Sequence, residues 1–110
     1  MKIIEEIVDR IGVLKLDGRL DASAVKMMKA NVNSMVEREI TSIVIDMNDV
    51  DFIDSSGLGS LVSCLRVVNK ENGDIRLASL QDQIRALLEL TRLHRVFQIF
   101  DNCETAVKSY

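Results

Sequence analysis

The sequence predicts a single α/β domain built on a mixed, mostly parallel β-sheet. Short β-rich runs alternate along the chain with longer stretches whose apolar residues recur every three or four positions. The 110 residues are the size of one domain and contain no proline, no repeat and no low-complexity linker. Strand–helix–strand alternation gives parallel strands joined by right-handed crossovers. We therefore expect residues 1–110 to fold as one unit with about four helices.

An antiparallel hairpin is expected at the N-terminus. Two β-rich runs, Ile3–Val8 and Ile11–Leu16, are separated by only two residues. Gly18 is expected to end the second strand, and Asp21 or Ser23 can cap the helix that follows. The hairpin would then supply an antiparallel edge to the sheet.

The remaining elements follow from apolar spacing. Helices are predicted over 22–37, from about 55 to 71, from about 80 to 90, and after Asp101, where Glu104 completes capping-box spacing. Their apolar faces are Val25, Met28, Val32, Met35 and Val36; then Leu58, Leu61, Val62, Leu65 and Val68; then Ile84, Leu87, Leu88 and Leu90. Strands are predicted at 43–45, 74–78 and 96–100, with a loop over 47–53.

Composition excludes several classes of function. The net charge is −3, with 17 acidic and 14 basic residues. Because the basic residues are scattered, this balance argues against a nucleic-acid-binding protein. No apolar run is long enough to cross a bilayer, and the N-terminus turns acidic too early for a signal peptide, so we expect a cytoplasmic protein. Cys64, Cys103 and the single His94 have no zinc-like spacing; we expect reduced thiols, no metal and no cofactor.

The predicted topology gathers polar residues at one edge of the sheet. Loops after parallel strands emerge at the carboxyl ends of those strands, where ligands bind in open α/β folds. The loops 18–23, 47–56 and 78–81 should therefore lie along one edge. The polar side chains that they would bring together are Asp21, Asp54, Ser55, Ser56 and Ser79.

The most distinctive segment is residues 51–60, Asp-Phe-Ile-Asp-Ser-Ser-Gly-Leu-Gly-Ser. Two glycines at the start of an apolar helix lower helix propensity, so they favour either close approach of another molecule or a tight helix–sheet contact. A phosphate on a serine here would meet the free amides of the helix N-terminus and would place about −1.5 to −2 charges beside Asp54. The alternative is that Asp54 or Ser55 is only a cap. Neither a hydrolase elbow nor a phosphate-binding loop is present.

Four segments, Leu16–Asp21, Ile43–Asp46, Phe52–Gly59 and Leu90–Phe97, together form a recognisable pattern. The pattern resembles the STAS domains of anti-sigma factor antagonists. Phe52–Gly59 is similar to the signature of that family, and Leu16–Asp21 to its first loop. Ile43–Asp46 resembles its central strand, and Leu90–Phe97 its C-terminal pattern. The likeness spans nearly the whole chain in the right order, which favours a switch over a simple cap.

The resemblance implies a binding module rather than an enzyme. Ser56 would be the phosphoacceptor, with Ser55 as the fallback, and Asp54 would hold the loop. The docking face would comprise Gly18, Leu20, Asp21, Asp54, Ser55, Ser56, Gly57, Leu58 and Gly59. Its partner would be an anti-sigma factor of the GHKL serine-kinase type, sequestered until it phosphorylates this chain. A PP2C-type phosphatase would restore the unphosphorylated form, and ATP and magnesium would belong to the kinase.

Two alternatives stay open at this level. The chain could instead be a constitutive STAS interaction subunit of a transporter or signalling scaffold, in which Ser56 only starts a helix. An enzyme or nucleotidase is favoured only by the glycines and the polar edge. Both a monomer and a weak dimer are compatible with an exposed edge strand.

Overall fold

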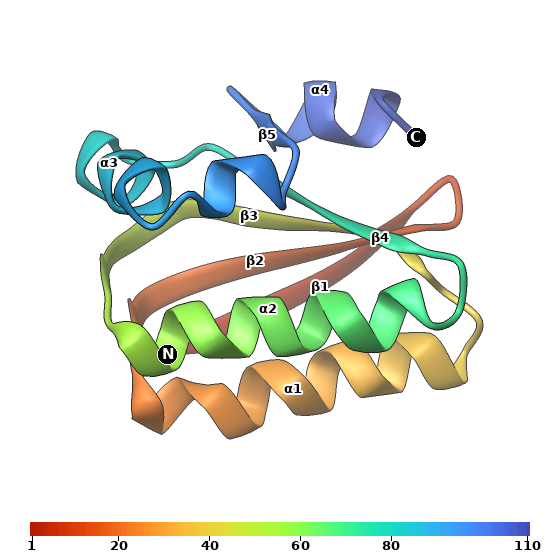
Figure 1. The fold of residues 1–110 in the computed structure, drawn as a ribbon. Helices are drawn as coiled ribbons and strands as arrows, with labels where there is room; N and C mark the ends of the chain where they lie inside the picture. The colour runs from red at the N-terminus through yellow and green to blue at the C-terminus, as the bar shows by residue number, and fades with distance from the viewer.

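Residues 1–110 are described by a computed structural model (Figure 1), and they form one five-stranded sheet in the order β1-β2-β3-β4-β5. The strands are β1 (Lys2–Val8), β2 (Ile11–Leu20), β3 (Ser42–Ile53), β4 (Asp74–Ala78) and β5 (Ile99–Phe100). The helices are α1 (Ala22–Glu37), α2 (Ser55–Asn69), α3 (Asp82–Leu90) and α4 (Cys103–Lys108), with a 3₁₀ turn, η1, at Leu93–Arg95. β1 and β2 are antiparallel, and each later pair is parallel. The predicted fold class and order of elements are confirmed.

The N-terminal hairpin turns on two residues without glycine. Asp9 and Arg10 both have positive φ angles, 50° and 67°. Two consecutive left-handed residues make the type I′ turn, whose twist matches that of the flanking strands. The turn therefore fixes the register in which Val8 lies opposite Ile11 and Lys2 opposite Asp17.

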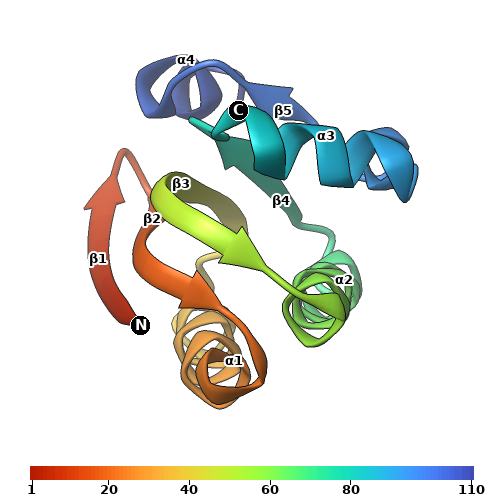
Figure 2. The same ribbon diagram turned by 90° about the vertical axis from the view of Figure 1, so that its left-hand side faces the viewer.

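The sheet is covered unequally on its two faces. Figure 2 shows α1 and α2 side by side against one face, and α4 against the other. The larger core includes Met28 and Met35 of α1, Leu61 and Val68 of α2, and the inward residues of β2, β3 and β4. A smaller core on the opposite face joins Val13, Val44 and Ala78 of the sheet to Ala106 of α4. This short helix leaves much of the β1 side of its face uncovered.

Two strands are longer than the sequence predicted. Gly18 does not end β2: it takes a φ of 120° beside a register shift, and the strand continues to Leu20. Residues 47–53, predicted as a loop, continue β3. The physical reason is mutual pairing, because β2 and β3 stay paired as far as Leu20 and Ile53, well past the end of β4.

The C-terminal third also departs from the prediction. Only Ile99 and Phe100 form the last strand, and Val96 is 52% exposed outside it. Asn102, not Asp101, caps α4 by accepting the amide of Thr105 at 2.8 Å. α3 begins at Asp82 without a side-chain cap, and Leu90 is 82% exposed instead of joining the apolar face. These segments are held by local turns more than by sheet pairing.

Candidate functional site

The paired ends of β2 and β3 deliver the start of α2 to the surface. Asp54 follows β3 directly and is the N-cap of α2: its Oδ1 accepts the amide of Gly57 at 2.9 Å, and its carbonyl accepts the amide of Leu58 at 2.9 Å. The amide of Asp54 in turn approaches the carbonyl of Leu20 at 3.4 Å. The expected cap and the expected helix start are confirmed.

Asp21 caps α1 at the neighbouring strand end. Its Oδ1 accepts the amide of Ser23 at 3.0 Å and the hydroxyl of Ser23 at 2.5 Å. The Ser23 hydroxyl, followed by its amide and by Arg19 at 3.6 Å, holds the pKa of the Asp21 carboxyl below its ordinary value. This carboxylate is therefore ionised and adds negative charge close to the start of α2.

Gly57 is required by the fold. A Cβ built on it would lie 2.8 Å from Cγ1 of Ile53 and 3.0 Å from the carbonyl carbon of Leu20, and closer still to the carbonyl oxygen of Leu20. The first turn of α2 thus rests on the backbone of β2, which no side chain at this position would permit. Gly57 belongs to the helix–sheet contact and is buried, so it offers a partner little surface.

Gly59 is the opposite case. It is exposed, and a Cβ at this position would meet nothing within 4 Å. Alanine would favour the helix there by roughly 0.5–1 kcal/mol. No contact inside this chain accounts for the glycine, whereas a molecule that must approach the helix backbone closely would account for it.

Ser55 and Ser56 occupy the first turn of α2, and both are exposed. First-turn amides have no acceptor within the helix, and the Asp54 side chain takes only that of Gly57. The amides of the two serines therefore remain available to an anion from solvent, and the helix dipole favours negative charge at this end. The geometry can tolerate a phosphorylated serine without unfolding the helix.

The residues predicted as a docking face are not all accessible. Asp21, Asp54 and Leu58 are partly exposed, and Gly18 is half-buried at its register shift. Leu20, in contrast, is fully buried, so its side chain supports the core and cannot touch a partner. The accessible residues that follow the ends of β2 and β3 are called the serine surface: Asp21, Asp54, Ser55, Ser56, Leu58 and Gly59. Gly18 is also partly accessible but lies within β2.

Sequence reasoning missed Arg19 and Phe52, which border the serine surface. The two residues are register partners on β2 and β3, and the guanidinium carbon of Arg19 lies 3.8 Å from the centre of the Phe52 ring. Arg19 also reaches Asp21. The pair forms only because both strands extend further than predicted. Finding it from the sequence would have required knowing the register between β2 and β3.

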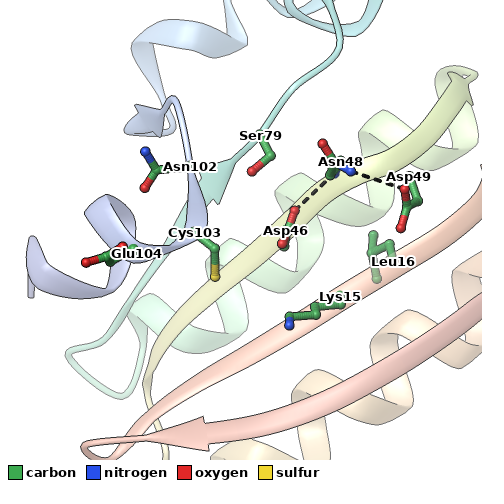
Figure 3. A pocket seen from close by; sticks show the side chains of 9 residues that line it. All are labelled: Lys15, Leu16, Asp46, Asn48, Asp49, Ser79, Asn102, Cys103 and Glu104. Carbon is green, nitrogen blue, oxygen red and sulfur yellow. Dashed lines mark hydrogen bonds between the residues drawn. The ribbon is translucent and has the colours of Figure 1, made fainter.

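Ser79 does not join the other polar residues. β4 ends opposite Asp46, and β3 continues for seven residues beyond it, about 20 Å at the usual strand rise. Ser79 instead lines a shallow cavity of about 440 Å³ on the α4 side (Figure 3). The other residues around it are Lys15, Leu16, Asp46, Asn48, Asp49, Asn102, Cys103 and Glu104. The expected single polar edge is thus divided in two.

Comparison with known proteins identifies the family. The profile of the STAS domain matches residues 2–106. The chain belongs to the STAS domain family. An anti-sigma F factor antagonist from Paenibacillus polymyxa is 25% identical over 91 residues, 82% of this chain and 78% of the relative.

Solved structures agree with this assignment. A candidate anti-sigma factor antagonist from Thermotoga maritima has a TM-score of 0.90 and 26% identity, covering 97% of this chain and 92% of its own. The Bacillus cell-fate determinant SpoIIAA in its phosphorylated form has a TM-score of 0.78 at 24% identity, with 98% of both chains covered, and shares the fold. The relatives are named as anti-sigma factor antagonists. None of the helices in this chain has the length and apolar character needed to cross a membrane.

Proposed function

We propose that this STAS domain is a phospho-switched antagonist of an anti-sigma factor. Unphosphorylated, it binds and sequesters an anti-sigma factor of the GHKL serine-kinase type through the serine surface. Phosphorylation of Ser56 by that kinase ends the complex, and a PP2C-type phosphatase restores it. The chain supplies the acceptor hydroxyl, and ATP and magnesium act in the kinase.

The observation that carries the proposal is the pairing of an exposed Ser56 with an exposed Gly59 on the first turns of one helix. The hydroxyl of Ser56 makes no hydrogen bond within the chain, so the fold does not need this serine. Gly59 leaves the helix backbone bare where a partner can approach. Ser56 and Gly59, which no contact within the chain requires, thus lie on the same surface.

The charges around Ser56 explain how one phosphate could end binding. Asp54 and Asp21 already place negative charge at this surface, and a phosphate adds about −1.5 to −2 at neutral pH. The first-turn amides of α2 can hold the phosphate, so the fold survives the modification. A partner that is apolar or acidic at this point would lose affinity through desolvation and repulsion. The existence of SpoIIAA in a phosphorylated form supports such a modification on this fold.

The test compares Ser56→Asp and Ser56→Ala with Ser55→Asp as a matched control. Intact-mass and fragmentation spectrometry of the chain from its own cells should place a phosphate on Ser56. The tagged wild type and Ser56→Ala should both capture the same ATP-binding kinase from a lysate, and Ser56→Asp should not. Ser55→Asp should weaken capture less, because it lies one residue from the acceptor.

Two results would contradict the proposal. A phosphate found only on Ser55 would make Ser55, and not Ser56, the phosphoacceptor. Equal capture by all variants, with no phosphate under any growth condition, would instead favour a constitutive interaction subunit. Circular dichroism of each variant keeps a loss of binding separate from a loss of folding.

A further inference from the structure

The edge strand β1 offers an unused pairing surface. It pairs only with β2, so its other side is open along seven residues. All residues of β1 except Ile3 are exposed, and Ile4 and Ile7 are 44% and 47% exposed. An extended edge with exposed isoleucines is a template for strand addition.

The hairpin turn decides which backbone groups are open. Its hydrogen bond joins Val8 to Ile11, and hydrogen-bonded positions alternate along an antiparallel pair. Val8, Glu6 and Ile4 therefore direct their amides and carbonyls toward β2. Ile3, Glu5 and Ile7 direct theirs outward.

The charges of Lys2 and Glu6 favour one register between two copies of β1. If a second β1 pairs antiparallel with Ile4 opposite Ile4, each Lys2 faces Glu6 of the other copy, and the outward groups of Ile3 meet those of Glu5. A register centred on Glu5 would lose both Lys2–Glu6 contacts, because each Lys2 would then face Val8 of the other copy. The Ile4-centred register also puts the Lys2, Ile4 and Glu6 side chains on one face, so two ion pairs flank an apolar contact.

We propose that two copies of this chain dimerise through β1, antiparallel and centred on Ile4, which joins their sheets into one. This goes beyond the proposed function and does not depend on it. Existing contacts do not oppose the arrangement: Glu6 pairs with Lys15 at 3.1 Å, but both side chains are nearly half exposed and the pair contributes little. Glu5 forms an ion pair with Arg38, the residue that follows α1, and can lie beside Ile3 of the second copy.

The dimer should be weak. One short strand pair buries less than the roughly 1,200 Å² of a stable interface. Its detection therefore requires either a covalent trap or a high protein concentration.

The first test fixes the register by disulfide trapping. In a background with Cys64→Ala and Cys103→Ala, Ile4→Cys should form a covalent dimer under mild oxidation, because residues facing their own copy lie about 4.5–5.5 Å apart between Cβ atoms. Glu5→Cys is the matched control and should form several-fold less. Faster trapping of Glu5→Cys, or equal slow trapping of both, would overturn the proposal.

The second test uses charge reversal and mixing. Lys2→Glu places like charges opposite each other in the homodimer, and so does Glu6→Lys. Each variant should dimerise about tenfold more weakly than wild type in sedimentation equilibrium at several hundred micromolar. An equimolar mixture of the two variants should recover the dimer, because both glutamates of one copy then face the two lysines of the other. A wild type that remains monomeric, or a mixture that behaves as the sum of its parts, would overturn the proposal.

Discussion

Alanine at Gly57 and alanine at Gly59 should have opposite effects on stability, although the two glycines are only two residues apart. At Gly57 the added Cβ would lie within 3.0 Å of the Leu20 carbonyl carbon and of Ile53. The nearest obstacle is backbone, which cannot rotate away, so the first turn of α2 must move off β2. Overpacking of this kind costs about 1–3 kcal/mol, from which the helix-propensity gain of alanine subtracts at most about 1 kcal/mol.

At Gly59 only the propensity gain applies. Because nothing lies within 4 Å of the added Cβ, Gly59→Ala should raise the free energy of unfolding by about 0.5–1 kcal/mol. The two variants should therefore differ by at least about 1 kcal/mol, in opposite directions from wild type. Urea unfolding followed by circular dichroism measures both free energies on the same scale.

Binding separates the two glycines further. If Gly59 leaves room for a partner, Gly59→Ala should weaken capture of that partner although the variant is more stable. Gly57→Ala should weaken capture only in proportion to its loss of folded structure. The reasoning would be refuted if both alanines destabilise equally, or if Gly59→Ala stabilises the chain and leaves capture unchanged.

Two further predictions concern groups away from the serine surface. The Tyr110 hydroxyl lies 2.7 Å from the carbonyl of Ile43 and 2.8 Å from that of Asp74, so it joins the starts of β3 and β4. Tyr110→Phe should lower the free energy of unfolding by about 0.5–1.5 kcal/mol in urea titrations, and an unchanged value would contradict this role. Burial raises the pKa of the Cys64 thiol from its ordinary 9.0 to about 11, so the folded state holds it protonated where the unfolded chain has ionised it. Stability from this thiol is complete below pH 9.0 and is lost as the pH rises toward 11. Cys64→Ala should therefore flatten the stability curve in that window, and parallel curves for the two proteins would argue against it.

Much of the fold could be predicted because its signals are local. The helix predicted over 22–37 has the bounds of α1, although Ala24 is fully buried where the predicted apolar face had Val25. The two-residue break at Asp9 and Arg10 marks the hairpin. Asp21 and Asp54 were recognisable as caps because an aspartate before a helical pattern satisfies the free amides of the first turn. These features depend on neighbours within a few residues, which the sequence displays directly.

The pairing of distant strands was not predictable in the same way. Residues 47–53 are polar at three positions and carry no clear strand signal, yet they pair with β2 because that strand also continues. This mutual extension separates Ser79 from Ser56 and creates the contact between Arg19 and Phe52. A strand whose partner lies some thirty residues away is decided by the partner as much as by its own residues.

Local residue patterns were enough to establish the class of the domain, its order of elements and the position of Ser56 at a helix start, because propensity, apolar periodicity and capping act over a few residues. The roles of the two glycines, in contrast, depend on packing across the whole fold. Gly57 is fixed by the carbonyl of Leu20, more than thirty residues earlier, whereas a Cβ added at Gly59 would meet nothing within 4 Å. The same residue type two positions apart thus stabilises a helix–sheet contact in one case and leaves backbone open to a partner in the other, since only packing distinguishes an occupied space from an empty one.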